Sequence, residues 1–152
     1  MVLDGTVGTL VDKTTVSGPC TVGSSLARST SILPAGQGFT VEVNPVSGAL
    51  FAAWYTYAPM GATAGAAGQR RYTAQATFTP GMRSIPVTIY ETTGGLFNTP
   101  TPPAQTVVVG TGTLAFQSCT AATFSYAFTG GSSGLSGTIT LSRVGPVPPG
   151  CT

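Results

Sequence analysis

The sequence predicts an all-β protein, a single-domain antiparallel β-sandwich or flattened barrel of seven to eight strands built mainly of consecutive hairpins. Three observations carry this prediction. Apolar and polar residues alternate with a period of two in most of the chain, as they do in half-buried strands. Stretches rich in Gly and Pro separate the alternating segments. We find no apolar repeat with the period of a helix.

The 152 residues of the chain are enough for one domain. We expect residues 19–152 to form the β-sandwich domain and residues 1–18 to be an N-terminal extension with one strand. That strand comprises Thr6, Val7, Gly8, Thr9, Leu10 and Val11. It pairs either with an edge of its own sheet, which is the simpler expectation, or with a neighbouring copy. Residues 17–31 should be a loop, because Gly, Ser and Pro are frequent there.

A hairpin over residues 38–57 is the centre of the predicted domain and holds the only tryptophan. In residues 38–44, Phe39, Val41 and Val43 alternate with polar residues, which predicts one buried face and one solvated face. The turn follows at residues 44–48, where Pro presets φ and Gly accepts a positive φ. In residues 49–57 both alternating sets are apolar, so we expect a central strand that is covered on both faces or nearly so.

Five further strands are predicted at residues 72–79, 85–90, 106–117, 123–129 and 136–143. Pro86 predicts an edge position or a bulge in the second of these. Gly110 and Gly112 predict a bend or bulge where the long strand crosses from one sheet to the next. Residues 92–104 form a long loop whose only apolar anchors are Leu96 and Phe97. A loop of this length is either functional or packed down by its anchors.

Charge is scarce: 7% of residues are charged, and the formal net charge is +2. Arg70 and Arg71 are the only adjacent basic pair, so we expect no nucleic-acid partner. No apolar run approaches the roughly 20 residues of a spanning helix, so no membrane span is expected. Because the chain has no histidine, the commonest general base and metal ligand is missing. We predict no catalytic residues, no metal site and no cofactor.

The three cysteines, Cys20, Cys119 and Cys151, are too far apart for a CxxC metal or redox motif, so disulfide pairing is the first interpretation. The odd number of Cys, the many Thr and the few Lys and Glu favour an extracellular location. Met1 is followed by Val-Leu-Asp-Gly, without the basic and apolar regions of a signal peptide. We therefore expect an exported protein whose leader is not present in this chain.

Four segments carry a family resemblance. They are residues 36–39 (GQGF), 53–57 (AWYTY), 90–97 (YETTGGLF) and the stretch from Gly112 through Cys119 to Arg143. Together they resemble a family of uncharacterised secreted bacterial β-domains with a cysteine-bounded C-terminal hairpin. The resemblance implies export, a β fold and a disulfide between Cys119 and Cys151, and it brings no settled activity. Cys20 is then a buried free thiol, a misassigned partner or a covalent link to another chain.

A candidate ligand platform consists of aromatic residues of the kind on which sugars stack, with charged residues at the rim. Its members are Trp54, Tyr55, Tyr57 and Tyr72, with Arg70, Arg71 or Glu42 at the rim. The alternation on a central strand favours the plainer interpretation, in which these aromatic rings belong to the core and its covering layer. Glu42 and Glu91 are the candidates for a glycosidase pair, although two isolated glutamates are more often solvated strand residues.

The composition favours an exported structural protein, a cell-surface or extracellular fibre or pilus-like subunit that assembles with copies of itself by strand exchange. In such an assembly the strand at residues 6–11 inserts beside a strand of the next subunit. The alternative is a carbohydrate- or surface-binding module that uses the aromatic strand at residues 49–57 and the loops at residues 60–69 and 92–104. An enzyme ranks third, since no catalytic group assembles from the sequence.

Overall fold

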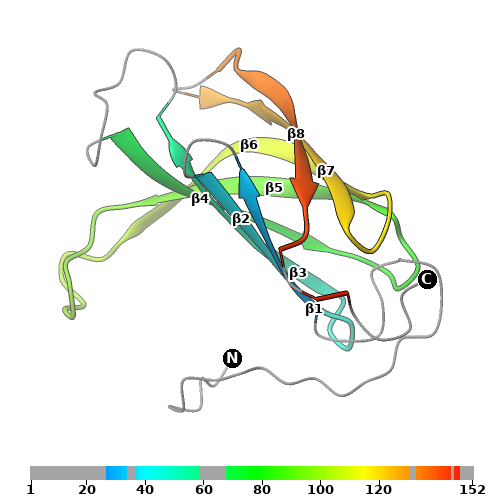
Figure 1. Cartoon of the computed structure of the whole chain (residues 1–152). Helices are drawn as coiled ribbons and strands as arrows, with labels where there is room; N and C mark the ends of the chain where they lie inside the picture. Colours follow the sequence, from blue (N-terminus) through cyan, green and yellow to red (C-terminus); the bar gives the residue numbers. More distant parts are fainter. Residues whose placement is uncertain (1–26, 34–36, 59–67, 131–132, 145, 148–152) are drawn as a thin grey trace.

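A computed structural model of the chain has an all-β fold in which one antiparallel sheet curls into a half-barrel (Figure 1). The structure describes residues 27–33, 37–58, 68–130, 133–144 and 146–147. The strands in these residues are β1 (Ala27–Leu33), β2 (Gln37–Asn44), β3 (Ala49–Tyr57), β4 (Gln69–Thr77), β5 (Ser84–Thr93), β6 (Gln105–Phe116), β7 (Ala121–Phe128) and β8 (Ser136–Ser142). The predicted all-β fold of consecutive hairpins is confirmed, in its flattened-barrel form.

Each strand pairs with the next one along the chain, so the order in the sheet is the order in the sequence. The curl brings β8 back near β1 (Figure 1). Within the described residues, no helix is long and apolar enough to cross a membrane. Because the sheet curls, it encloses its own core, and each strand has an inner face and an outer face.

The strand β1 corrects one expectation, because it lies largely within the segment predicted as a loop at residues 17–31. It pairs with β2 from Ala27 opposite Val43 to Leu33 opposite Gln37. Most of its side chains are Ser, Thr and Arg, so it lacks the apolar alternation by which the other strands were recognised. The predicted strand at residues 6–11 and most of the loop at residues 60–69 lie outside the described residues.

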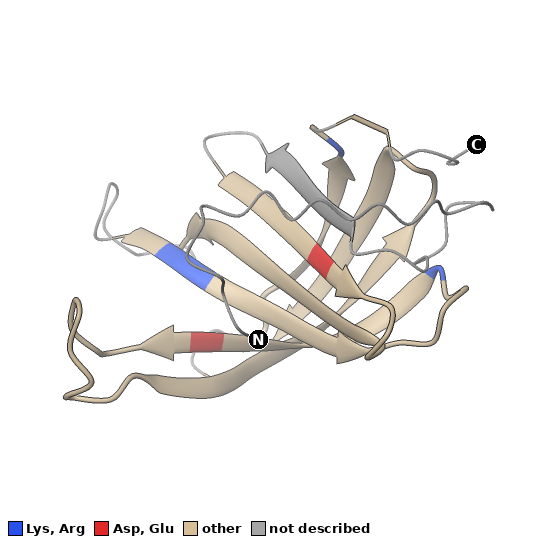
Figure 2. Ribbon diagram, turned by 90° about the horizontal axis from the view of Figure 1, so that it is seen from below, with Lys and Arg blue, Asp and Glu red and all other residues tan. Residues whose placement is uncertain are grey.

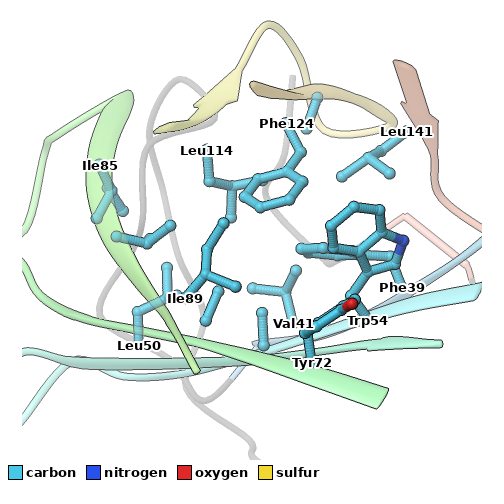
Figure 3. Close-up of a cluster of buried hydrophobic side chains, with 14 of the residues drawn as sticks. Phe39, Val41, Leu50, Trp54, Tyr72, Ile85, Ile89, Leu114, Phe124 and Leu141 are labelled. Carbon is cyan, nitrogen blue, oxygen red and sulfur yellow. The ribbon is translucent and has the colours of Figure 1, made fainter. Parts of the chain in front are cut away.

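The inner face carries the apolar core (Figure 3). Its largest fully buried side chains are Phe39, Phe124, Ile85, Ile89 and Leu114. Aromatic rings from opposite sides of the curl meet there: the Trp54 ring lies 5.6 Å from the ring of Phe124 and 5.0 Å from the ring of Tyr126. These separations fall in the range of favourable ring contacts. Packing between β3 and β7 therefore closes the half-barrel from within.

The strand β3 was predicted to be covered on both faces, and this prediction is wrong. Leu50, Ala52 and Trp54 are buried on the inner face, as expected. The alternate side chains of Phe51 and Tyr55 are exposed on the outer face. A single curled sheet has one inner face to fill, so apolar residues on the outer face of β3 gain no second layer from the other described strands.

The bend predicted at Gly110 and Gly112 is present, although it lies within one sheet rather than between two. Ile89 of β5 pairs with Gly110 while Tyr90 pairs with Val108, so Val109 is an extra residue in β6. A Cβ on Gly110 would lie 2.5 Å from the carbonyl oxygen of Ala127, and one on Gly112 would lie 2.6 Å from that of Ser125. Both glycines therefore allow a close approach of β6 and β7.

Pro86 occupies the edge position that its missing N–H predicts. The pairing between β4 and β5 is short and runs only from Tyr72 opposite Glu91 to Gln75 opposite Thr88. Pro86 lies beyond the end of this ladder and pairs with Thr113 of β6 alone. No hydrogen bond to β4 is lost, because the β4 ladder has already ended.

Gly112 provides a test of the packing between β6 and β7. Gly to Ala in a strand normally stabilises by about 0.5–1 kcal/mol, but here the new methyl group would meet backbone and the ring of Phe124. We expect Gly112→Ala to lower the free energy of unfolding by about 1–3 kcal/mol. Urea denaturation measures the change, with Thr111→Ala at the neighbouring exposed position as the control. Equal stability of the two variants would contradict the close approach.

Candidate functional site

The four aromatic residues predicted as a platform do not lie on one face. Trp54 and Tyr72 belong to the inner core, and their rings lie 5.6 Å apart. The Nε1 of Trp54 is buried and has no hydrogen-bond partner among the residues that the structure describes, where this side chain is held by ring packing. Tyr55 and Tyr57 point to the outer face instead. The predicted platform is thus corrected to its two exposed members.

Tyr55 and Tyr57 continue a row of aromatic side chains that begins at Phe51. We call these three residues the β3 aromatic strip; their exposed fractions are 43% for Phe51, 47% for Tyr55 and 41% for Tyr57. Alternate residues of a strand point to the same face about 6.7 Å apart. Ala53, between Phe51 and Tyr55, is small and buried, and Gly38 lies opposite Tyr55 on β2. On the β2 side, the residue opposite the Tyr55 ring therefore has no side chain.

Polar side chains of β4 border the aromatic strip. Arg71 lies opposite Tyr55, and Gln69 lies opposite Tyr57. An open depression of about 260 Å³ lies here, lined by Tyr55, Thr56, Tyr57, Gln69, Arg70 and Arg71. A second depression of about 470 Å³ shares Gln69 and both arginines with the first and adds Glu91, Thr92 and Thr93 of β5. Two adjoining hollows thus meet at the adjacent arginines.

The two arginines have different surroundings, because neighbouring residues on a strand face opposite sides of the sheet. The Nε of Arg70 lies 3.9 Å from an oxygen of Glu91. Nearby, the Thr56 hydroxyl donates a hydrogen bond of 2.6 Å to the side-chain oxygen of Gln37. Burial raises the pKa of Tyr72, the negative charge of Glu91 raises it further, and Arg70 lowers it. Arg70 thus has an acidic neighbour on its side of the sheet.

Glu42 and Glu91 do not form the glycosidase pair considered from the sequence. Glu42 lies opposite the exposed Phe51, and Glu91 lies opposite the buried Tyr72. The two carboxylates therefore belong to opposite faces, and β3 and β4 separate their strands. A glycosidase needs both carboxylates on either side of one glycosidic bond, which this arrangement prevents.

The strands β5 and β6 extend beyond the sheet as a two-stranded arm, which we define as residues 92–108 (Figure 1). Pairing of β5 with β4 ends at Glu91, and pairing of β6 with β7 begins at Gly110. At the tip, Phe97 is fully exposed and Leu96 is 64% exposed. Of the two alternatives for this loop, packing by its two apolar residues does not occur. A functional role is the alternative that remains for a loop of this length.

The arm also presents a free strand edge. Among the described residues, the segment 105–108 has no partner on the side that β7 occupies further along. Val107 and Val108 in this segment are 53% and 57% exposed. No charged residue occurs between Thr92 and Ser142, and Figure 2 shows the charges on other parts of the sheet. That uncharged interval was a sequence signal, although sequence reasoning did not connect it with an exposed edge.

Cys119 lies in the short connection between β6 and β7 and is disulfide-bonded. Cys20 and Cys151 are outside the described residues, so the pairing of Cys119 with Cys151 stays a prediction. One contact supports it: the N–H of Arg143, just after β8, donates to the carbonyl oxygen of Thr120 at 2.9 Å. The chain thus leaves β8 beside Cys119, eight residues before Cys151.

Comparisons with known proteins found no matching family model, no matching curated protein and no matching solved structure. The resemblance to secreted bacterial β-domains therefore stays a prediction based on four sequence segments. Function has to be inferred from the side chains and strand edges that the fold leaves exposed.

The disulfide pairing can be tested by stability measurements on single and double variants. If Cys119 and Cys151 are partners, Cys119→Ser, Cys151→Ser and the double variant should all lose about 2–5 kcal/mol of unfolding free energy. The double variant should lose no more than either single variant, because one bond is removed in each case. Cys20→Ser is the matched control. If Cys20→Ser costs as much as Cys119→Ser while Cys151→Ser costs little, Cys20 is the partner instead.

Proposed function

We propose that this chain is an exported structural protein, a cell-surface or extracellular fibre subunit that assembles through β-strand contacts. The observation that carries the proposal is the uncharged edge of β6 at residues 105–108 on the protruding arm, beside which no described strand pairs on the β7 side. The disulfide at Cys119 supports export, since such bonds persist mainly in oxidising compartments.

Free strand edges usually carry features that prevent pairing with other chains. Charged residues, prolines, bulges and short strands are the common protections, because an open edge offers unpaired N–H and C=O groups to any strand that approaches. Residues 105–108 contain no charge and no proline, and the bulge at Val109 lies just beyond them. Val107 and Val108 are β-branched residues, which favour strand pairing. These four residues therefore suit the acceptor edge of an assembly.

The distribution of charge supports contact between copies. From Thr92 to Ser142 the chain has no charged side chain, so this region adds no charge repulsion when two copies approach each other. The fully exposed Phe97 at the tip adds apolar surface that contact with another copy would remove from water.

The donor in this proposal is the strand predicted at residues 6–11, which lies outside the described residues. A strand from one copy that adds to β6 of the next gives a head-to-tail contact, and such contacts propagate when the rotation between copies does not close. The mechanism is strand exchange, and its partner is a second copy of the chain.

The acceptor edge can be blocked by charge without changing the core. Val107→Lys combined with Val108→Lys places two like charges on exposed positions of the edge. We expect this variant to stay monomeric under conditions in which the native protein forms multimers or filaments, measured by light scattering and negative-stain microscopy. The matched control is Val46→Lys with Val144→Lys, which adds the same charge at exposed valines outside the arm.

Two outcomes would contradict this function. If the native protein is monomeric over the whole accessible concentration range, with and without reductant, there is no assembly to explain. If the control variant is impaired as much as the arm variant, added charge rather than the edge is responsible. Deletion of residues 1–16 tests the donor separately, and a deletion variant that still polymerises would exclude the strand at residues 6–11 from this role.

A further inference from the structure

We infer that the β3 aromatic strip and Arg71 form a binding site for a linear polysaccharide that carries carboxylate groups. This site goes beyond the proposed assembly, because it uses the outer face of β3 and β4 rather than the arm edge. Its centre is the depression beside Tyr55 and Tyr57.

The two tyrosines have the geometry of a stacking surface. Both lie on the outer face of one strand, and both rings are close to half exposed. Gly38 lies opposite Tyr55 on β2 and has no side chain, so no β2 side chain covers the Tyr55 ring from that position. Tyrosine rings combine an apolar face with a polar hydroxyl, which suits sugars, whose rings have apolar faces and polar edges. Because the two positions are about 6.7 Å apart along the strand, the row follows a chain rather than a compact ligand.

The depression also supplies polar groups at its border. Gln69 lies opposite Tyr57 and lines both hollows. Its amide has donors and an acceptor for sugar hydroxyls. Binding sites for small molecules typically combine apolar surface with a few polar groups that set orientation, and the pairs Tyr55 with Arg71 and Tyr57 with Gln69 provide this combination.

Arg71 determines the class of sugar. The carboxylates of the described residues are those of Glu42 and Glu91. Neither forms an ion pair within 4.0 Å with Arg71 in the described part of the chain, whereas Glu91 lies near Arg70. A guanidinium group binds a carboxylate through two parallel hydrogen bonds. Arg71 is thus available to a ligand carboxylate beside the tyrosines.

The Phe51 end of the strip is flanked by an acidic and an amide residue. Glu42 of β2 and Gln75 of β4 lie opposite Phe51, whereas Arg71 lies opposite Tyr55. Tyr55 follows Phe51 by four positions, which is about 13 Å along a strand. We therefore place the recognised carboxylate at the Tyr55 end, where Arg71 lies, and assign Phe51 only to stacking.

The test uses uncharged and acidic oligosaccharides of the same length with the full chain. The acidic probes are oligomers of galacturonate, glucuronate and mannuronate, and the neutral probes are the corresponding hexose oligomers, with affinity measured by calorimetry. Replacing Tyr55 and Tyr57 together by Ala should abolish binding of the acidic probe. Arg71→Gln should weaken it about tenfold or more, since a hydrogen bond to a charged group contributes roughly 1.5–3 kcal/mol.

Two matched variants keep this test specific. Arg83→Gln removes one exposed positive charge outside the site, and Phe97→Ala removes an exposed ring from the arm. Both should bind the acidic probe with native affinity. All the substituted side chains are wholly or partly exposed, so thermal melting should confirm that each variant is folded.

The inference is overturned if none of the acidic probes binds, if the neutral probes bind as tightly as the acidic ones, or if Arg83→Gln weakens binding as much as Arg71→Gln. Its failure is distinguishable from failure of the proposed function. The variant with Lys at positions 107 and 108 should bind the acidic probe as the native protein does, whether or not the native protein forms multimers.

Discussion

Closure of one sheet around its own aromatic core is the constraint on which the rest of this structure depends. Trp54 on β3 and Phe124 on β7 come from opposite sides of the curl and meet at 5.6 Å. Between β5 and β7, the strand β6 has a bulge, with Val109 as an extra residue. Gly110 and Gly112 let the backbone of β7 come within a distance that any side chain would prevent. The absence of a side chain at these two glycines therefore lets β6 and β7 lie close together beside the aromatic core.

A fold with one curled sheet has consequences for its outer surface. The core needs only the inner set of each alternating strand, so the outer set can vary without changing the fold. Along most of the chain that set consists of Thr, Ser and Gln. The exceptions on the outer face are Phe51, Tyr55 and Tyr57 of β3, and the arm adds Val107 and Val108, which are exposed on its two faces. Exposed apolar groups in contiguous rows commonly mark interaction surfaces.

The alternation of apolar and polar residues was sufficient to predict most strands and the inner set of each. Each of the buried residues Phe39, Ile85, Leu114 and Phe124 belongs to a strand in which apolar and polar side chains alternate. Pattern alone could not separate the two faces of β3, since both are apolar and only the number of layers decides which is covered. The strand β1 was missed because hydroxyl residues carry no burial signal, and register with β2 determines its place. The exposure of Phe97 depends on where the neighbouring ladders end, which no local pattern encodes.

The two proposed surfaces lie on opposite sides of the arm. On the β5 side, Thr92 and Thr93 line the larger depression together with Gln69 and the two arginines. On the β6 side, residues 105–108 form the edge without a described partner. This edge faces the side on which β7 pairs with β6 from Gly110 onward. A strand that adds to β6 would therefore approach from the side away from Arg71. If both proposals hold, subunits can join through the arm while the aromatic strip stays open to a polysaccharide.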